Sequence, residues 1–273
     1  MAYYAKVIED TIANHGVRIT TMELCYPRFI HSEIMTHRDR ARNSASSRAI
    51  PFPKMLERIQ SDPVIPIRFG SEQKGMQTGG EIDDPEEARM IWLSARDTAV
   101  FHAKNLAKLG VHKSICNRLV EPFMYITVVM TATDWNNFFR LRLHPDAEIH
   151  FQELARLMKE ALDTSFPQKR NWGEWHLPYV TLEERTAQLE EELLAKLSTA
   201  RCARVSYLTH DGVPDRTKDL NLFDRLTEGS GFGHWSPMEH PAIPNQFPDS
   251  RSGPYRGWVQ FRKLFPNECA KEE

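Results

Sequence analysis

The chain lacks several features that mark common classes of protein. Its formal net charge is −2 over 273 residues, so it has no excess of positive charge of the kind that favours nucleic acid binding. No apolar run approaches the roughly 20 residues of a membrane span, and the N-terminal residues show no signal-peptide pattern. We therefore expect a cytoplasmic protein with neither a nucleic acid nor a membrane as partner.

Cysteine is scarce and scattered. The four cysteines form no CxxC pair, which argues against a zinc knuckle and favours a reduced compartment. They are Cys25, Cys116, Cys202 and Cys269. None lies in a recognisable nucleophile setting, so covalent catalysis through a thiolate has no support in the sequence.

Familiar cofactor and nucleophile motifs are missing as well. No GxGxxG follows a predicted strand, and neither GxxxxGK[ST] nor GxSxG occurs. These absences argue against a Rossmann dinucleotide site, a P-loop kinase and an α/β-hydrolase.

The most unusual stretch that is present runs from Thr36 to Pro51 and reads THRDRARNSASSRAIP. It combines four arginines with histidine, asparagine and three serines, and no apolar stripe runs through it. These are His37, Arg38, Arg40, Arg42, Asn43, Ser44, Ser46, Ser47 and Arg48. Arginine forks and serine hydroxyls together suit a phosphate, which predicts a site for a phosphorylated small molecule. The alternative is a solvated, charged loop.

Periodicity predicts an α/β (α+β) fold with a central sheet flanked by helices. Strands are expected over 17–26 and 124–132. Helices are expected over 5–14, ending at Gly16, and over 28–38, 52–59, 85–109, 113–121, 134–142 and 146–163. In the long helix, Asp83 or Asp84 would cap the start and Gly110 would close the end. Its expected core face comprises Met90, Leu93, Val100, Phe101 and Leu109.

The chain is expected to form one domain, 1–273. Its N-terminal block spans 1–165, an irregular aromatic linker spans 166–180, and a C-terminal block spans 181–273. The C-terminal block should contain a charged helix over 181–198, a second helix over 219–229, and an ordered aromatic and basic piece over 255–265.

A second unusual stretch, HWSPMEH at 234–240, places two histidines and a glutamate within seven residues. It could orient a ligand, or it could be a turn whose Glu239 and His240 bond to backbone groups. Pro237 and Pro241 prevent the single helical face that an HExxH metal site requires. We predict no bound metal.

Two further polar residues, Asn137 and Arg142, follow a predicted helix start. An amide such as that of Asn137 offers a donor and an acceptor together, which suits the edge of a heterocycle. A guanidinium such as that of Arg142 could stabilise a pyrimidine that has lost a ring N–H proton. The alternative for Arg142 is a surface salt bridge.

Together these residues resemble the flavin-dependent thymidylate synthases. The family signature of Arg-His-Arg followed by Asn-Glu-x-Ser-x-Arg is met by His37, Arg38, Asn43, Ser46 and Arg48. A second family block is matched by Ala203 to Tyr207 and by His234, Ser236, Pro237, Glu239 and His240. A third is matched by Arg118, Asn137 and Arg142. In the family the second block comes first, whereas here it comes last, so the chain resembles a circularly permuted version.

The resemblance implies a homotetramer with FAD between subunits and active sites shared among chains. It implies that NADPH reduces the flavin, that methylenetetrahydrofolate supplies a one-carbon unit, and that dUMP becomes dTMP without a covalent enzyme nucleophile.

The resemblance also implies roles for individual residues. The expected FAD contacts are His37, Arg38, Asn43, Thr131, Ala132, Thr133, Asn137 and Ser236. The expected nucleotide contacts are Ser44, Ser46, Ser47, Arg48, Arg118 and Arg142. Arg142 would act as the catalytic residue by stabilising the N3-deprotonated pyrimidine electrostatically.

The chain departs from the family pattern at Thr36, Ser44, Glu33 and Asp146. Because these departures affect nucleotide contacts, three alternatives stay open. They are a hydroxymethylated product, another substrate such as dCMP, and a non-catalytic nucleotide-binding relative. Gln260 and Arg262 in the tail could supply the missing contacts.

Overall fold

The computed structural model describes residues 3–207, 215–227, 233–266 and 268, with the side chains of Ser206 and Tyr207 excepted. Those two side chains, matched above to a family block, lie outside the described part of the chain. So do Gly229, the expected end of a helix, and Cys269.

The described chain is a mixed α/β fold built on a five-stranded sheet in the order β3-β4-β2-β1-β5. The strands are β1 (Tyr4–Ala13), β2 (Arg18–Pro27), β3 (Ala41–Ser44), β4 (Tyr125–Ala132) and β5 (Gln168–Arg170). All neighbours are antiparallel except β1 and β5. The predicted fold class and the strands at 17–26 and 124–132 are confirmed.

The predicted helix over 5–14 is wrong, because these residues form strand β1. Strand β1 pairs with β2 from Tyr4↔Cys25 to Ile12↔Arg18, and cross-strand pairing outweighs local helix propensity. Gly16, expected as a helix cap, has φ +86° and sits in the turn of this hairpin instead.

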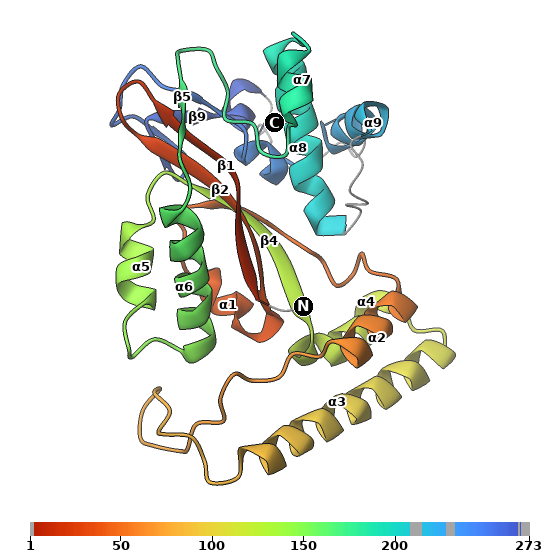
Figure 1. Ribbon diagram of the computed structural model, residues 1–273. Helices are drawn as coiled ribbons and strands as arrows, with labels where there is room; N and C mark the ends of the chain where they lie inside the picture. Colours follow the sequence, from red (N-terminus) through yellow and green to blue (C-terminus); the bar gives the residue numbers. More distant parts are fainter. Residues whose placement is uncertain (1–2, 208–214, 228–232, 267, 269–273) are drawn as a thin grey trace, which may run out of the picture.

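One face of the sheet packs against α1 (His31–Ile34), α5 (Asn136–Arg142) and α6 (Ile149–Asp163) (Figure 1). Even-numbered apolar residues of β2 and β4 belong to this core, among them Met22, Leu24, Ile126, Val128 and Met130. The helix expected over 28–38 is shorter than predicted. It consists of a 3-10 turn, η1 (Arg28–Ile30), followed by α1.

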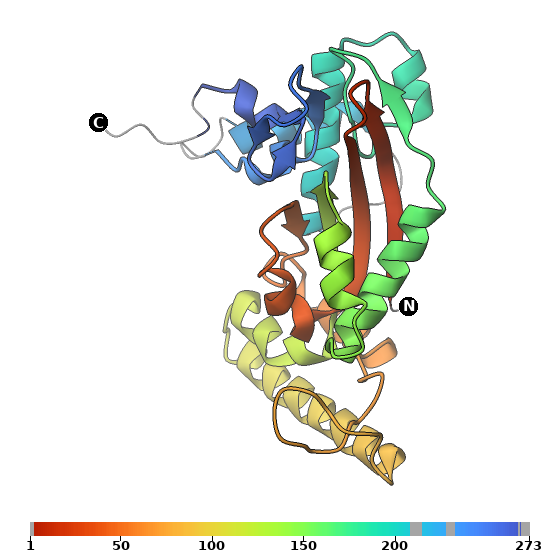
Figure 2. The ribbon, with the colours of Figure 1, turned by 90° about the vertical axis from the view of Figure 1, so that its left-hand side faces the viewer.

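At one end of the molecule lie α2 (Phe52–Ser61), α3 (Pro85–Lys108), α4 (Lys113–Cys116) and the 3-10 helix η2 (Asn117–Phe123) (Figures 1 and 2). Asp84 caps α3 as predicted, with its carboxylate accepting from the Glu87 N–H at 2.9 Å. The predicted core face of α3 is wrong in part. Val100 is buried, but Met90, Phe101 and Leu109 are exposed because only one side of the helix meets the protein body.

The other end contains α7 (Leu182–Thr186), α8 (Glu191–Tyr207) and α9 (Arg216–Thr227). The single helix predicted over 181–198 is therefore two helices, and Gln188 between them has φ +54°. The tail adds the short elements η3 (Ser236–Glu239), β6 (Ala242–Pro244), β7 (Arg251–Ser252), β8 (Tyr255–Arg256), β9 (Trp258–Gln260) and η4 (Phe261–Leu264).

The segment 166–180, expected to be an irregular linker, contributes strand β5 and then four consecutive buried residues, 175–178. His176 forms a backbone bridge to Ala242 on β6 through hydrogen bonds of 2.8 and 3.2 Å. This segment therefore holds the C-terminal elements against the hairpin of β1 and β2.

Candidate functional site

The first cluster of predicted site residues joins His37 to Arg142. The Nε atom of Arg142 donates to Nε2 of His37 at 2.9 Å, and the guanidinium carbon lies 4.3 Å from the centre of the Phe151 ring. Phe138 and Phe151 meet the imidazole edge-on. Burial, then the charges of Arg40 and Arg142, lower the pKa of His37 to about 4. His37 is therefore a neutral acceptor that fixes the direction of the catalytic arginine predicted from the sequence.

Two neighbouring arginines have different surroundings. Arg40 is buried and pairs with Asp39 at 2.6 Å, and its guanidinium carbon lies 5.0 and 4.8 Å from the ring centres of Trp135 and Phe138. Arg42 donates to the His37 carbonyl oxygen at 2.5 Å. Arg40 therefore packs the sheet edge, whereas Arg42 adds positive charge beside the His37 pair.

A second histidine, His31, extends this positive region and was missed by the sequence analysis. Its Nδ1 lies 2.9 Å from the Tyr26 hydroxyl, and its Nε2 lies 3.5 Å from the Ser44 hydroxyl. Burial, then the charges of Arg28 and Arg42, lower its pKa to about 4. The nearest carboxylate to Arg28 is Glu121, at 3.8 Å. The sequence did hold a sign of His31, because Arg28, His31 and Glu33 lie in one segment. That segment was interpreted only as an amphipathic helix.

The predicted phosphate ligands fall into two groups. Ser44 lies half-buried beside His31, and Ser46 is half-buried two residues later. Ser47 is buried, and its hydroxyl donates to Glu121 at 2.6 Å. Arg48 and Arg118 are exposed and, within the described part of the chain, make no hydrogen bond or ion pair. The structure thus brings Ser44 to the positive cluster and leaves the two arginines with free guanidinium groups.

A different set of predicted residues converges on His240. Asn43 of β3 lies with its amide 3.2 Å from Nε2 of His240, and Nδ1 of His240 lies 2.8 Å from the Thr131 hydroxyl on β4. The end of the Asn43 amide that faces His240 also lies 3.2 and 3.1 Å from the carbonyl oxygens of Ser236 and Arg42, and two carbonyl neighbours suit the amide nitrogen there. Three residues expected to contact FAD, namely Asn43, Thr131 and Ser236, therefore come together from separate parts of the chain.

The hydrogen bonds continue from Thr131 across the sheet. The hydroxyls of Thr131 and Thr21 lie 2.6 Å apart, and Thr21 lies 2.7 Å from Nε2 of His176. Nδ1 of His176 lies 2.8 Å from the Thr11 hydroxyl. We call this series, from Thr11 through His176, Thr21, Thr131 and His240 to Asn43, the histidine–threonine chain. Burial lowers the pKa of His240 to about 3 and that of His176 well below its ordinary value.

The remaining predicted cofactor residues are more dispersed. Ala132 is buried in the core, and the hydroxyl of Thr133 accepts from the Arg256 N–H at 3.1 Å. Arg38 and Asn137 are exposed. The Asn137 side chain lies 3.4 Å from Arg140 on the same helix.

Gln260 and Arg262 stand beside Glu239 of the second unusual stretch. Arg262 pairs with Glu239 at 2.6 Å and with Glu268 at 2.8 Å. Gln260 is buried, and its amide nitrogen lies 3.4 Å from the Glu239 carbonyl oxygen. Both tail residues hold the 234–240 turn in place, and their contacts are with the protein itself.

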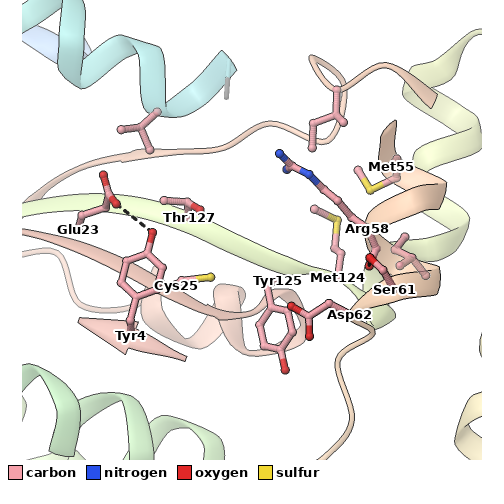
Figure 3. A pocket seen from close by; sticks show the side chains of 13 residues that line it. Tyr4, Glu23, Cys25, Met55, Arg58, Ser61, Asp62, Met124, Tyr125 and Thr127 are labelled. Carbon is pink, nitrogen blue, oxygen red and sulfur yellow. Dashed lines mark hydrogen bonds between the residues drawn. The ribbon is translucent and has the colours of Figure 1, made fainter. Parts of the chain in front are cut away.

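A cavity of about 500 Å³ lies on the sheet face opposite α5 and α6 (Figure 3). Glu23 lies at one side, where the Tyr4 and Tyr179 hydroxyls donate to its two oxygens at 2.9 and 2.6 Å. Arg58 reaches in from α2, and Cys25 forms part of the floor. None of the residues that the sequence analysis assigned to the site lines this cavity.

Within the described ranges, no group of three or more histidine, cysteine, aspartate or glutamate side chains is arranged to hold a metal ion. No helix there is long and apolar enough to cross a membrane.

No protein-family model matches the chain, and no curated protein sequence matches it. Among solved structures, it is similar to a UMP/dUMP methylase, PolB from Streptomyces cacaoi, bound with 5-Br UMP. That likeness has a TM-score of 0.49 and 14% identity, over 59% of this chain and 88% of the other. The same methylase bound with 5-Br dUMP gives a TM-score of 0.44 and 18% identity, over 53% of this chain and 66% of the other.

Proposed function

We propose that the protein transfers a one-carbon unit from methylenetetrahydrofolate to C5 of a pyrimidine deoxynucleotide, converting dUMP to dTMP with FAD as cofactor and NADPH as reductant. One observation carries the proposal. Residues that the family resemblance selected from three distant blocks, Asn43, Thr131 and Ser236, meet around His240. These residues are far apart in the sequence, so their contact in the fold is not a consequence of being neighbours in the chain.

The chemistry of the donor groups suits an anionic cofactor and a nucleotide monophosphate. Arg28, Arg42 and Arg142 surround His31 and His37, and both histidines are kept neutral in this positive field. Among the described residues, Arg142 donates only through Nε, so its two terminal nitrogens have no partner there. Phosphate oxygens match such spare guanidinium donors.

In this proposal FAD, when bound, supplies the hydride that completes the methyl group. Asn43, Thr131 and Ser236 would hold the cofactor. Arg142 would hold the pyrimidine ring and stabilise the negative charge that develops when N3 loses its proton. His37 would keep Arg142 in place by accepting its Nε hydrogen. The carboxylate of Glu33 shares this environment, because the charge of Arg142 is among those that act on it.

We also propose that the active site is shared within a homotetramer. Arg38, Arg48, Arg118 and Asn137 are expected to contact ligands, yet all four are exposed on one protomer. Several large apolar residues on and beside α3 are exposed as well. They are Met90, Ile91, Phe101, Leu109, Ile115 and Leu119. Exposed apolar residues in one region are typical of an interface between subunits.

The proposal is tested by an absorption spectrum of the purified protein before and after denaturation. A flavin band that is released as free FAD is expected, and dUMP should perturb the bound spectrum. Product analysis after incubation with NADPH, methylenetetrahydrofolate and either dUMP or dCMP then identifies the substrate and separates methylation from hydroxymethylation. Absence of flavin, even after FAD is added and the protein is desalted, would favour a non-catalytic nucleotide-binding protein instead.

A further inference from the structure

In the histidine–threonine chain, the direction of each hydrogen bond constrains the direction of the next. Its six side chains come from four strands of the sheet and two later segments, and five of them are 0–1% exposed, with Asn43 at 7%. Water therefore has little access, and protein groups must satisfy the donors and acceptors. Each neutral histidine has one donor nitrogen and one acceptor nitrogen, so if every threonine hydrogen is used within the series, the bonds run in one of two directions.

The amide of Asn43 decides between these two directions. If its oxygen faced Ser236 and Arg42, an acceptor would meet two carbonyl oxygens. With its nitrogen there, the two amide hydrogens face three acceptors, namely these two carbonyl oxygens and Nε2 of His240. Because Nε2 of His240 then accepts, the hydrogen of this imidazole must be on Nδ1.

The same direction passes along the whole chain. Nδ1–H of His240 donates to Thr131, and the Thr131 hydroxyl donates to Thr21. The Thr21 hydroxyl donates to Nε2 of His176, whose Nδ1–H then donates to Thr11. Both histidines therefore carry their hydrogen on Nδ1, whereas free neutral histidine prefers Nε2.

We propose that His176 and His240 are positioning residues that hold the Asn43 amide in one orientation, with its oxygen turned away from the Ser236 and Arg42 carbonyls and presented to an N–H donor of the ligand. The identification of that ligand as the flavin rests on the proposed function. His176 acts on Asn43 through four hydrogen bonds, with Thr21, Thr131 and His240 between them. Nothing in its sequence neighbourhood, TrpHisLeuPro, suggested a role in the site.

The tautomers can be measured directly by nitrogen NMR on protein labelled with ¹⁵N-histidine, without any ligand. We expect His176 and His240 each to give the Nδ1–H pattern as a single species. A dominant Nε2–H form at either histidine would overturn the proposal, because the bonds would then run in the other direction or be interrupted.

The hydroxyl of Thr21 provides the link to cut, with a matched pair of variants. Thr21→Val keeps the side-chain shape and removes the hydroxyl, whereas Thr21→Ser keeps the hydroxyl. In Thr21→Val, His176 loses its donor, and the Thr131 proton, now without its acceptor, competes for Nδ1 of His240. We expect both histidines to lose the pure Nδ1–H pattern and the Kd for FAD to rise about tenfold, against a change of at most about twofold in Thr21→Ser.

The control concerns Tyr255, a fully buried residue outside the histidine–threonine chain. Its hydroxyl donates to the Glu239 carbonyl oxygen at 2.7 Å. Tyr255→Phe should leave both tautomers unchanged, because the direction of donation does not run through it. Loss of the pattern in Tyr255→Phe, or its full retention in Thr21→Val, would contradict the coupling.

The two levels of proposal fail separately. If Thr21→Val changes the tautomers but leaves FAD affinity equal to that of the wild type, the orientation of Asn43 does not matter for flavin binding. The proposed role of His176 and His240 in positioning Asn43 for the ligand is then overturned. If the wild type binds no FAD at all, the proposed function fails, and the wild-type tautomers still decide the orientation of Asn43. Should Thr21→Val not fold, the wild-type spectrum and Tyr255→Phe remain decisive.

Discussion

The Nε atom of Arg142 on α5 donates to Nε2 of His37, which follows α1, at 2.9 Å. These residues are 105 positions apart in the sequence, and each was assigned to the site for a different reason. The pair leaves the terminal nitrogens of Arg142 available while fixing the plane of the guanidinium against Phe151. Such a prearranged charge is a common means of stabilising a developing anion.

Arg142→Ala should retain FAD and lose most turnover. Loss of one preorganised charge at a developing anion typically lowers the rate by about 10²–10³ fold. The measurement is kcat with saturating dUMP, together with the flavin absorbance per protomer. Arg140→Ala is the matched control, because Arg140 is exposed on the same helix and should leave both quantities near wild type. Near-normal turnover in Arg142→Ala would remove the proposed role.

Buried neutral histidines predict a particular loss of stability in acid. Burial is the leading reason that His31, His37, His176 and His240 have a lowered pKa in the folded protein. The unfolded chain therefore binds these protons near pH 6.5, whereas the native state resists them. Stability should be complete above pH 6.5 and should fall as pH decreases toward 4, by up to about 1.4 kcal/mol per pH unit for a fully buried histidine.

Urea unfolding at pH 7.5, 6.0 and 5.0 measures this slope. His240→Asn removes one titrating group from the core and should flatten the curve relative to the wild type, even if the variant is less stable at pH 7.5. His102→Asn, at an exposed position on α3, is the control and should leave the slope unchanged. A wild-type stability that is constant from pH 7.5 to 5.0 would contradict the prediction.

Arg201 lies at the centre of a buried ion-pair network between α7, α8 and α9. It donates to both oxygens of Glu184 at 2.6 Å and to Asp219 at 2.8 Å, and all three side chains are buried. Burial alone would raise the pKa of Glu184, but the hydrogen bonds from Arg201 bring it to about 2. Arg201→Ala would leave two buried carboxylates without this partner.

We expect Arg201→Ala to lower the free energy of unfolding by about 3–5 kcal/mol. Arg156→Ala provides the comparison, because Arg156 pairs with Glu153 and Glu160 on the exposed face of α6. Its loss should cost less than about 1 kcal/mol. Equal losses in the free energy of unfolding for the two substitutions would show that the buried network stabilises the protein no more than the surface ion pairs do.

Cys25 tests whether a thiol takes part in the reaction. It lies in the floor of the cavity beside Glu23, and burial raises its pKa to about 12. The thiolate needed for attack on a pyrimidine is therefore disfavoured. Cys25→Ala should retain turnover within about threefold of the wild type. Two results together would contradict the non-covalent mechanism. They are loss of turnover in Cys25→Ala and a nucleotide covalently attached to the Cys25 peptide of the wild type in mass spectra.

The parts of the fold that the sequence predicted best are those with strong local signals. The segment 124–132 is mostly apolar and β-branched, and the start of α3 has an aspartate followed by proline, so both were found. Strand β1 was missed because Tyr4–Ala13 is only half-buried along most of its length. Its extended conformation depends on hydrogen bonding to β2. Local periodicity cannot report a pairing that depends on another segment.

For the candidate site, the resemblance identified Asn43, Arg142 and Ser236, but it could not identify His31 or His176. His31 has Arg28 nearby in the sequence, but Arg42 and Ser44 reach it from strand β3, which pairs with β4. His176 lies in a segment without periodicity, and its partners Thr11 and Thr21 are more than 150 residues away. Polar contacts over such separations leave no pattern in a single sequence.

The bond between Asn43 and His240 spans 197 residues of sequence, and that between Thr11 and His176 spans 165. During synthesis on the ribosome, the sheet strands β1 to β4 emerge long before His240, so any pairing of these strands before then forms with Thr131 lacking its histidine partner. Closing such long loops is slow compared with forming local hairpins. The nascent chain would therefore acquire its hydrogen-bonded centre last, and until then the threonine hydroxyls of the sheet would remain accessible to water.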